Sequence, residues 1–327
     1  LDSHTLLTSY SSLRLDNYVY TLESFQEARG LLKPKGAMVV AFASGGTFVT
    51  DRMFAMLAKA FGERPKMFVT GYDASGIVFV LGNVNANSTF ADVSSYFPRP
   101  EFNGLLATDT WPFIYLAERA IPVAIISALL IFVFLAGYAL WLVLRNTSFS
   151  LDKQSAPIYA QLFFLGAGFL LLETKAITEL SLVFGSTWIV NAIVIFAILL
   201  MAFLANYIIQ KTSVNQIIIF IGLFGFLLIN FFFPYQSLNS FSVAVKVLAA
   251  LAIVGLPIFF SGMAFSRCFR DVTFPAAALG INLFGAVIGG LTENVVMIGG
   301  IPLLGIMTIL LYTFAFIPLV SKIQVRQ

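Results

Sequence analysis

Seven apolar stretches of about 20 residues follow one another from Ile121 onward, and they constrain this chain more than any other feature. A helix needs about 20 residues to cross the hydrocarbon core of a bilayer. We therefore predict an α-helical integral membrane bundle of about seven spans over residues 121–327, with the lipid bilayer as its surroundings. The stretches cover residues 121–144, 158–184, 187–209, 216–233, 241–263, 274–298 and 301–320.

Residues 1–107 have a different character, with mixed charge and only short apolar runs, as expected of a water-soluble segment. Thr21 is a candidate helix cap, and Asp51 is expected at the start of a second helix. Helix, strand, helix and a hairpin in this order describe the back half of a Rossmann-like, doubly wound α/β sheet, and we expect its first strand to be covered on both faces. The front half, with its Gly-rich cofactor turn, is missing. The expected elements are a helix at 21–32, a strand at 37–43, a helix at 51–63 and strands at 66–71 and 76–83.

The reactive residue types are few, which excludes several kinds of site. Cys268 is the single cysteine and His4 the single histidine, so neither a disulfide nor a Cys/His metal site is expected within one chain. The net charge of +3 is small and predicts no nucleic-acid partner. Because the chain begins at Leu1, with no signal peptide before it, we expect it to be processed or truncated.

Several motifs carry a resemblance that covers nearly the whole chain. They are "LDSHTLLTSYSSLRLDNYVYT" at the N-terminus, "TDTWPFIYL" at 108–116, "FFLGAGFLLLETKAITELSLVFGSTWIVNA" at 163–192 and "ALGINLFGAVIGGLTE" at 278–293. The chain resembles the C-terminal portion of the membrane-bound spermidine-synthase-like proteins, in which an S-adenosylmethionine-dependent transferase domain is fused to transmembrane helices. The resemblance implies a partial Rossmann-like domain at 1–107, an interfacial linker at 108–120 and a membrane domain at 121–327.

The departures from that family bear on catalysis. In "DSHTL", Asp2 matches the family's first acid, but Thr5 stands where the second, amine-serving acid belongs, and a threonine cannot accept a proton from an amine at neutral pH. Asp2 and Asp16 are therefore weak catalytic candidates only. No cofactor is expected in this chain, and S-adenosylmethionine or its decarboxylated form is expected if the domain is completed. We predict a non-catalytic accessory subunit of a membrane complex; the alternatives are a transferase whose N-terminal half is missing, and a transporter.

Five ionisable residues lie inside the apolar stretches. Each costs on the order of 3 kcal/mol on insertion scales, so each should have a partner. Counting along the helices puts Glu173 and Lys246 at matching depth, and we expect them to form an ion pair within one polar cluster. The cluster is either a substrate or proton site, or a structural ion-pair network. Its expected members are Glu173, Lys175, Glu179, Lys246 and Glu293.

Other residues of the membrane segment suggest packing roles. Gly280, Gly285 and Gly289 lie close to one stripe of the sixth span, where another helix can approach closely. Asn230 is the only strongly polar residue of the Phe-rich stretch "IFIGLFGFLLINFFF" in the fourth span, and we expect this span to face lipid or a partner protein. Trp111, Tyr115 and Trp141 are expected at the membrane interface around the first span.

The side of the membrane on which the soluble segment lies is predicted differently by two arguments. Lys and Arg gather in one set of loops and at the C-terminus, so the positive-inside rule makes that side cytoplasmic and the soluble segment extracytoplasmic. The resemblance implies a cytoplasmic segment, because S-adenosylmethionine is a cytosolic metabolite. The expected location is the bacterial inner membrane. The unpaired edge of a half-sheet predicts other membrane subunits as partners.

Overall fold

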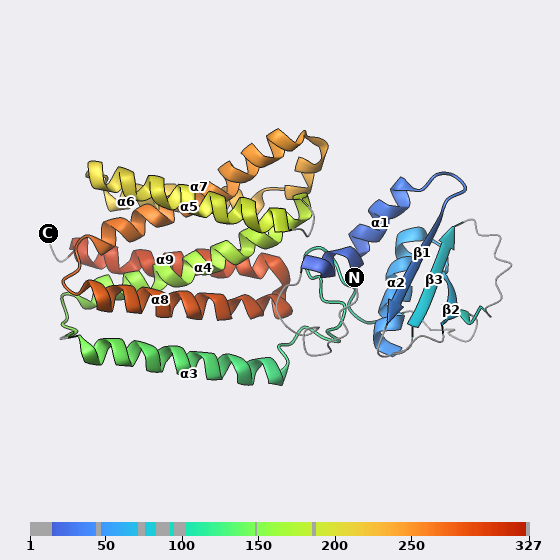
Figure 1. Cartoon of the computed structure of the whole chain (residues 1–327), viewed down its shortest axis with the longest axis horizontal. Helices are drawn as coiled ribbons and strands as arrows, with labels where there is room; N and C mark the ends of the chain where they lie inside the picture. Colours follow the sequence, from blue (N-terminus) through green and yellow to red (C-terminus); the bar gives the residue numbers. More distant parts are fainter. Residues whose placement is uncertain are drawn as a thin grey trace. The chain divides into compact units, whose positions relative to one another are not determined.

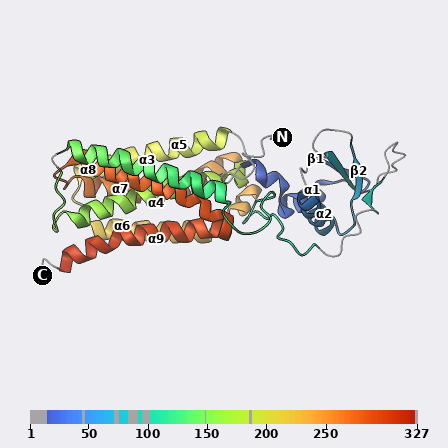
Figure 2. The same cartoon turned by 90° about the horizontal axis from the view of Figure 1, so that it is seen from below.

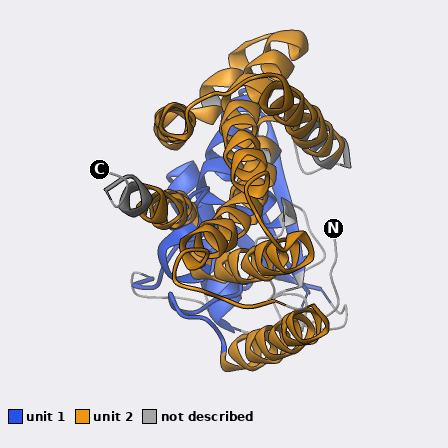
Figure 3. Cartoon of the chain, turned by 90° about the vertical axis from the view of Figure 1, so that its left-hand side faces the viewer, with its two compact units in different colours: residues 1–122, 297–300 blue, residues 123–296, 301–327 orange. Residues whose placement is uncertain are grey.

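A computed structural model describes residues 15–43, 47–70, 76–82, 92–94, 102–147, 149–184 and 188–324. The chain divides into two compact units, which Figure 3 draws in different colours. Unit 1 contains residues 1–122 and 297–300, and unit 2 contains residues 123–296 and 301–327.

Unit 1 begins, among its described residues, with the 3-10 turn η1 (Leu15–Tyr20) and helix α1 (Leu22–Leu31). The predicted cap is confirmed, because the Thr21 hydroxyl accepts a hydrogen bond from the Ser24 amide at 3.3 Å. The same hydroxyl donates to Asp109 Oδ1 at 2.7 Å, and the Leu22 amide donates to the Ala107 carbonyl. These bonds fix the start of α1 to the segment that precedes unit 2 in the sequence.

The described strands of unit 1 form a three-stranded sheet in the order β1-β3-β2. They are β1 (Ala37–Ala43), β2 (Lys66–Val69) and β3 (Gly76–Gly82), and β3 is antiparallel to both neighbours. The predicted β2–β3 hairpin is therefore confirmed. Since β1 and β2 both oppose β3, they run parallel to each other, and helix α2 (Thr47–Phe61) connects them.

Both helices of unit 1 pack on one face of the sheet. Val40 and Phe79 belong to the same buried cluster as Phe25 of α1 and Met53 of α2. The prediction that this strand is covered on both faces is wrong, because Val39, on the opposite face of β1, is 63% exposed. An apolar run alone does not tell how many layers cover a strand; here α1 and α2 contact each other on the same side.

Helix α2 begins at Thr47, one turn earlier than the expected start at Asp51. The buried face of the helix already includes Val49 and Thr50, so the apolar periodicity extends across the acid. Asp51 therefore lies within the helix, not at its first position.

Arg52 of α2 holds the segment before unit 2. Its guanidinium is fully buried and donates to the carbonyls of Phe113 and Ile114 at 2.7 and 2.8 Å. Desolvation lowers the pKa of Arg52 to about 10, so it remains charged at neutral pH. Trp111 is also packed within this unit: its ring is 1% exposed and lies near the Arg52 guanidinium, and its indole nitrogen donates to the Met297 carbonyl of the same unit. The segment 108–116 is thus part of the packed unit.

Unit 2 is a bundle of long helices that run beside one another in alternating directions (Figures 1 and 2). The 3-10 turn η3 (Tyr235–Ser240) separates α6 from α7, and η4 (Glu293–Val295) separates α8 from α9. Helix α9 contains a break at Gly300, whose φ of 70° suits glycine. The helices are α3 (Val123–Asn146), α4 (Ala156–Phe184), α5 (Trp188–Lys211), α6 (Gln216–Phe232), α7 (Val243–Phe269), α8 (Pro275–Thr292) and α9 (Val296–Gln324).

Four helical segments among the described residues are long and apolar enough to cross a membrane. The stretch Ile195–Lys211 of α5 and helix α6 (Gln216–Phe232) are apolar but shorter. Helix α3 has no buried residue, although the mean hydropathy of its most apolar window is 2.6. Such a helix is consistent with a lipid environment, since its large side chains would otherwise face water. The four segments are Val123–Asn146, Ala156–Leu180, Val243–Phe269 and Pro275–Leu319.

Candidate functional site

Helix α4 is central to unit 2 and contacts α5, α7, α8 and η3. It carries charged side chains on two different faces. Lys175 and Glu179 are four residues apart and share one face. Glu173 precedes Lys175 by two residues, which is about 200° around a helix of 3.6 residues per turn, so it points in nearly the opposite direction.

A buried polar network forms on the first of these faces. Lys175 Nζ lies 2.5 Å from Glu179 Oε1 and 2.6 Å from Asn230 Oδ1 of α6. Asn230 Nδ2 donates to the Tyr235 hydroxyl of η3 at 2.6 Å, and this hydroxyl also faces the Glu179 carboxylate. The four side chains are all buried.

The charges within this network compensate each other. One cation meets one anion, and an amide and a phenol provide further hydrogen bonds, which makes buried charge easier to tolerate. One atom is left over, since the buried Glu179 Oε2 has no hydrogen-bond partner among the described residues. The members come from α4, α6 and η3, so the network fixes these elements in register. This arrangement matches the structural interpretation of Lys175 and Glu179.

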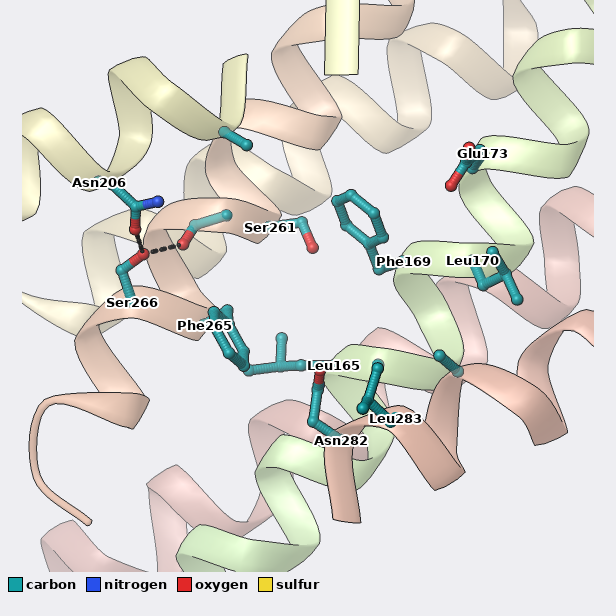
Figure 4. A pocket seen from close by; sticks show the side chains of 14 residues that line it. Leu165, Phe169, Leu170, Glu173, Asn206, Ser261, Phe265, Ser266, Asn282 and Leu283 are labelled. Carbon is teal, nitrogen blue, oxygen red and sulfur yellow. Dashed lines mark hydrogen bonds between the residues drawn. The ribbon is translucent and has the colours of Figure 1, made fainter. Parts of the chain in front are cut away.

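A cavity of about 410 Å³ lies on the other side of α4, between α4, α5, α7 and α8 (Figure 4). Its volume is within the range of small-molecule sites. The walls are mainly aliphatic and aromatic, with the rings of Phe169 and Phe265 and the side chains of Leu165, Leu170 and Leu283.

The neutral polar side chains of the cavity already have partners within the protein. The Ser266 hydroxyl donates to Asn206 Oδ1, as the dashed line in Figure 4 shows. Ser261 Oγ and the Tyr312 hydroxyl are 2.7 Å apart, and Asn282 Nδ2 donates to the Leu162 carbonyl at 2.8 Å. Each of these side chains therefore already has at least one hydrogen-bond partner within the protein.

Glu173 is the exception among the polar side chains that line the cavity. Its carboxylate is half-buried, and it makes no hydrogen bond or ion pair with the described residues. The predicted pair with Lys246 is not formed between these two residues. Figure 4 shows Glu173 on the opposite side of the cavity from the Asn206–Ser266 pair. The cavity is therefore an apolar chamber with one unpartnered anionic group.

Close packing of α4 against α8 forms one wall of this chamber. A Cβ on Gly285 would lie 2.0 Å from the Phe163 carbonyl oxygen, and one on Gly289 would lie 2.0 Å from the Ala167 carbonyl oxygen. Glycine at both positions lets the two backbones touch. Gly280 differs, because a Cβ there would meet side chains of α3 at an ordinary 3.4 Å.

Lys246 and Glu293, which were also singled out in the sequence, do not line this cavity. Lys246 is half-buried in the first turn of α7, and Glu293 is half-buried in η4. Asp16 lies in η1, although its side chain is outside the described part of the structure, as is the whole of Asp2. Among the described residues, no group of three His, Cys, Asp or Glu side chains could hold a metal ion.

The sequence placed Lys175 and Glu179 in one polar cluster but did not predict that Asn230 and Tyr235 belong to it. The fourth span was expected to face lipid or a partner protein, but its Asn230 is 2% exposed and bonded to Lys175. A single strongly polar residue in an apolar helix was the available signal, since such a residue rarely faces hydrocarbon. Tyr235 gave no signal, because it lies just beyond an apolar stretch, where tyrosine is common at the membrane interface without any buried partner.

Comparison with known proteins found no matching family model, no matching curated protein and no matching solved structure.

Proposed function

We propose that this chain is an integral membrane protein that holds an apolar, lipid-like molecule within its helical bundle and does not itself catalyse a reaction. The cavity beside α4 is the observation that carries the proposal. A chamber with mainly apolar walls gains free energy by excluding water from both the walls and an apolar guest. Its hydroxyl and amide groups already have hydrogen-bond partners within the protein, so none of them is placed as a nucleophile beside a general base.

We propose seven crossings for this protein. The alternating directions of α3 to α9 support this number, since consecutive antiparallel helices joined by short connections return the chain to the opposite side each time. Lys and Arg side chains at the α3–α4, α5–α6 and α7–α8 connections support a cytoplasmic location for those connections in a bacterial inner membrane. The soluble segment is then extracytoplasmic.

Retention of a bound molecule tests the proposed function. The full chain, purified in a neutral maltoside detergent, is expected to carry a lipid-like adduct in native mass spectrometry. Ala202 and Ala286 line the cavity from α5 and α8. Ala286→Phe and Ala202→Leu each fill part of the chamber, so each should reduce adduct occupancy while the thermal transition is preserved. An adduct that persists at full occupancy in both folded variants would argue against binding in this cavity.

A second candidate function, an accessory subunit of a membrane complex, is favoured by the sheet of unit 1. Among the described strands, β1 pairs only with β3, and its outer face carries the exposed Val39. A free edge beside an apolar face is the arrangement to which another chain adds a strand. We propose that a strand of a second membrane subunit occupies this edge.

Site-specific crosslinking tests the subunit proposal. A photo-crosslinking residue at Val39 is expected to give one discrete adduct in native membranes. Leu31 provides the matched control, because it is also apolar and is 85% exposed, but it lies at the end of α1. Adducts of the same pattern at both positions, or none at Val39, would contradict a partner at the edge of β1.

The transferase alternative remains a proposal of its own. The parallel β1–α2–β2 crossover supports the idea that this sheet is the back half of a doubly wound fold. Aminopropyl or methyl transfer would then require a completing segment that supplies the cofactor turn and the second acid. A transporter would use the same cavity with Glu173 as its ion-binding group.

A further inference from the structure

We infer that the molecule held beside α4 carries a cationic ammonium group that binds Glu173. This inference rests on the proposed function and specifies the chemical class of its ligand. The starting point is the imbalance within the cavity: Glu173 is unpartnered, whereas the Asn206–Ser266 pair, Ser261 and Asn282 are bonded internally.

An anionic group beside an apolar chamber favours a cation. A carboxylate that loses water without gaining donors is destabilised, and an ammonium group restores both a counter-charge and up to three donors. A neutral alcohol would restore one donor and no charge. A ligand carboxylate would place a second negative charge next to the first.

No cation of the described part of the protein takes this role. Lys175, the nearest lysine in the sequence, is directed to the opposite face of α4 and is bound to Glu179 and Asn230. The other residues that line the cavity are uncharged. We therefore assign the cation that pairs with Glu173 to the bound ligand.

The cavity also defines the body of the ligand. Leu165 and Glu173 both line it and are eight residues apart on α4, which corresponds to about 12 Å along the helix. Phe169 lies between them on the same helix, and Phe265 faces them from α7 (Figure 4). An unbranched apolar chain with its amine at the Glu173 end fits this length and lining.

Three probes with the same chain and different head groups test this assignment: decylamine, decanol and decanoate. Each is titrated against the purified full chain, and occupancy is measured by native mass spectrometry. We expect decylamine to bind about tenfold or more tightly than decanol, because charge-assisted hydrogen bonds exceed neutral ones by this order. Decanoate should bind most weakly.

Variants separate the head group from the chamber. Glu173→Gln keeps the size of the side chain and should remove the preference for decylamine. The affinity of this variant for decylamine should then be close to its affinity for decanol. Glu293→Gln removes a carboxylate that does not line the cavity and should leave the preference unchanged. Glu173→Asp should retain part of it.

The outcomes distinguish failure of the ammonium assignment from failure of the proposed function. If the three probes bind wild type equally, or if Glu173→Gln keeps the preference for the amine, the ammonium assignment is overturned while the chamber remains a binding site. If no probe binds, and Ala286→Phe and Ala202→Leu behave as wild type does, the proposed function itself fails and the assignment with it.

Discussion

Two charged residues of α4, separated by a single threonine, differ in whether they have a partner within the protein. Lys175 is enclosed by Glu179 and Asn230, whereas Glu173 faces the chamber without a protein partner. The sequence reveals that both lie in an apolar helix, and from depth alone it suggests that Glu173 pairs with Lys246. Depth ignores direction around the helix axis, and direction decides which side chains meet. Charged residues in apolar helices indicate that a polar cluster exists. Which residues belong to it depends on their direction around the helix axis, and the sequence does not give that direction.

The network around Lys175 can be tested as a structural device. Glu179→Leu leaves a buried ammonium with only Asn230, and we expect a loss of about 3 kcal/mol in the free energy of unfolding. The double variant Lys175→Met with Glu179→Leu removes both charges and should recover most of the loss. Denaturant unfolding of the purified chain measures each value. A double variant no more stable than the single one would point to a role for Lys175 beyond the pair.

At the scale of helices and strands, regular patterns translated well into structure. The cap of α1, the hairpin of β2 and β3, and the positions of the long helices follow from local residue patterns and apolar runs. The start of α2 and the bare face of β1 were not predictable, because both depend on which other element packs against them. The near contact of α4 and α8 depends likewise on facing carbonyls that only the fold brings together.

The glycines of α8 give a matched pair of substitutions at this scale. Gly285→Ala places a methyl group against the Phe163 carbonyl, and we expect it to destabilise the bundle by about 1–3 kcal/mol. Gly280→Ala adds the same methyl group at an ordinary contact distance and should change stability by no more than about 0.5 kcal/mol. Thermal unfolding in detergent compares the two. Equal effects would mean that α4 and α8 are further apart than this geometry has them.

For the whole molecule, the number of crossings decides how its loops are distributed. Four helical segments are long and apolar enough to cross a membrane, whereas Ile195–Lys211 of α5 and the whole of α6 are shorter apolar segments. Composition identifies the membrane class readily, but it cannot decide whether a short apolar helix crosses. That question depends on the neighbours that shield it, since α6 packs on α7, with the ring of Phe226 stacked on that of Phe260.

Accessibility of three exposed loop positions tests the seven-span arrangement. In a Cys268→Ser background, single cysteines replace Lys153, Ser213 or Ser240, which precede α4, follow α5 and follow α6. A membrane-impermeant maleimide should label the first two from one side of sealed vesicles and the third from the other side. If Ser213→Cys and Ser240→Cys share a side opposite to Lys153→Cys, then α5 and α6 do not cross.

The internal bonding of Ser261, Ser266 and Asn282 has a consequence for selectivity. A wall whose polar side chains already have protein partners offers few directional contacts to a guest. Such a chamber recognises one terminus chemically and the remainder by its length and apolar character, so unbranched guests that differ in unsaturation should be nearly equivalent to it. Discrimination then depends on a single carboxylate, and exchanging that one side chain would redirect the site to a different class of molecule without rebuilding the bundle.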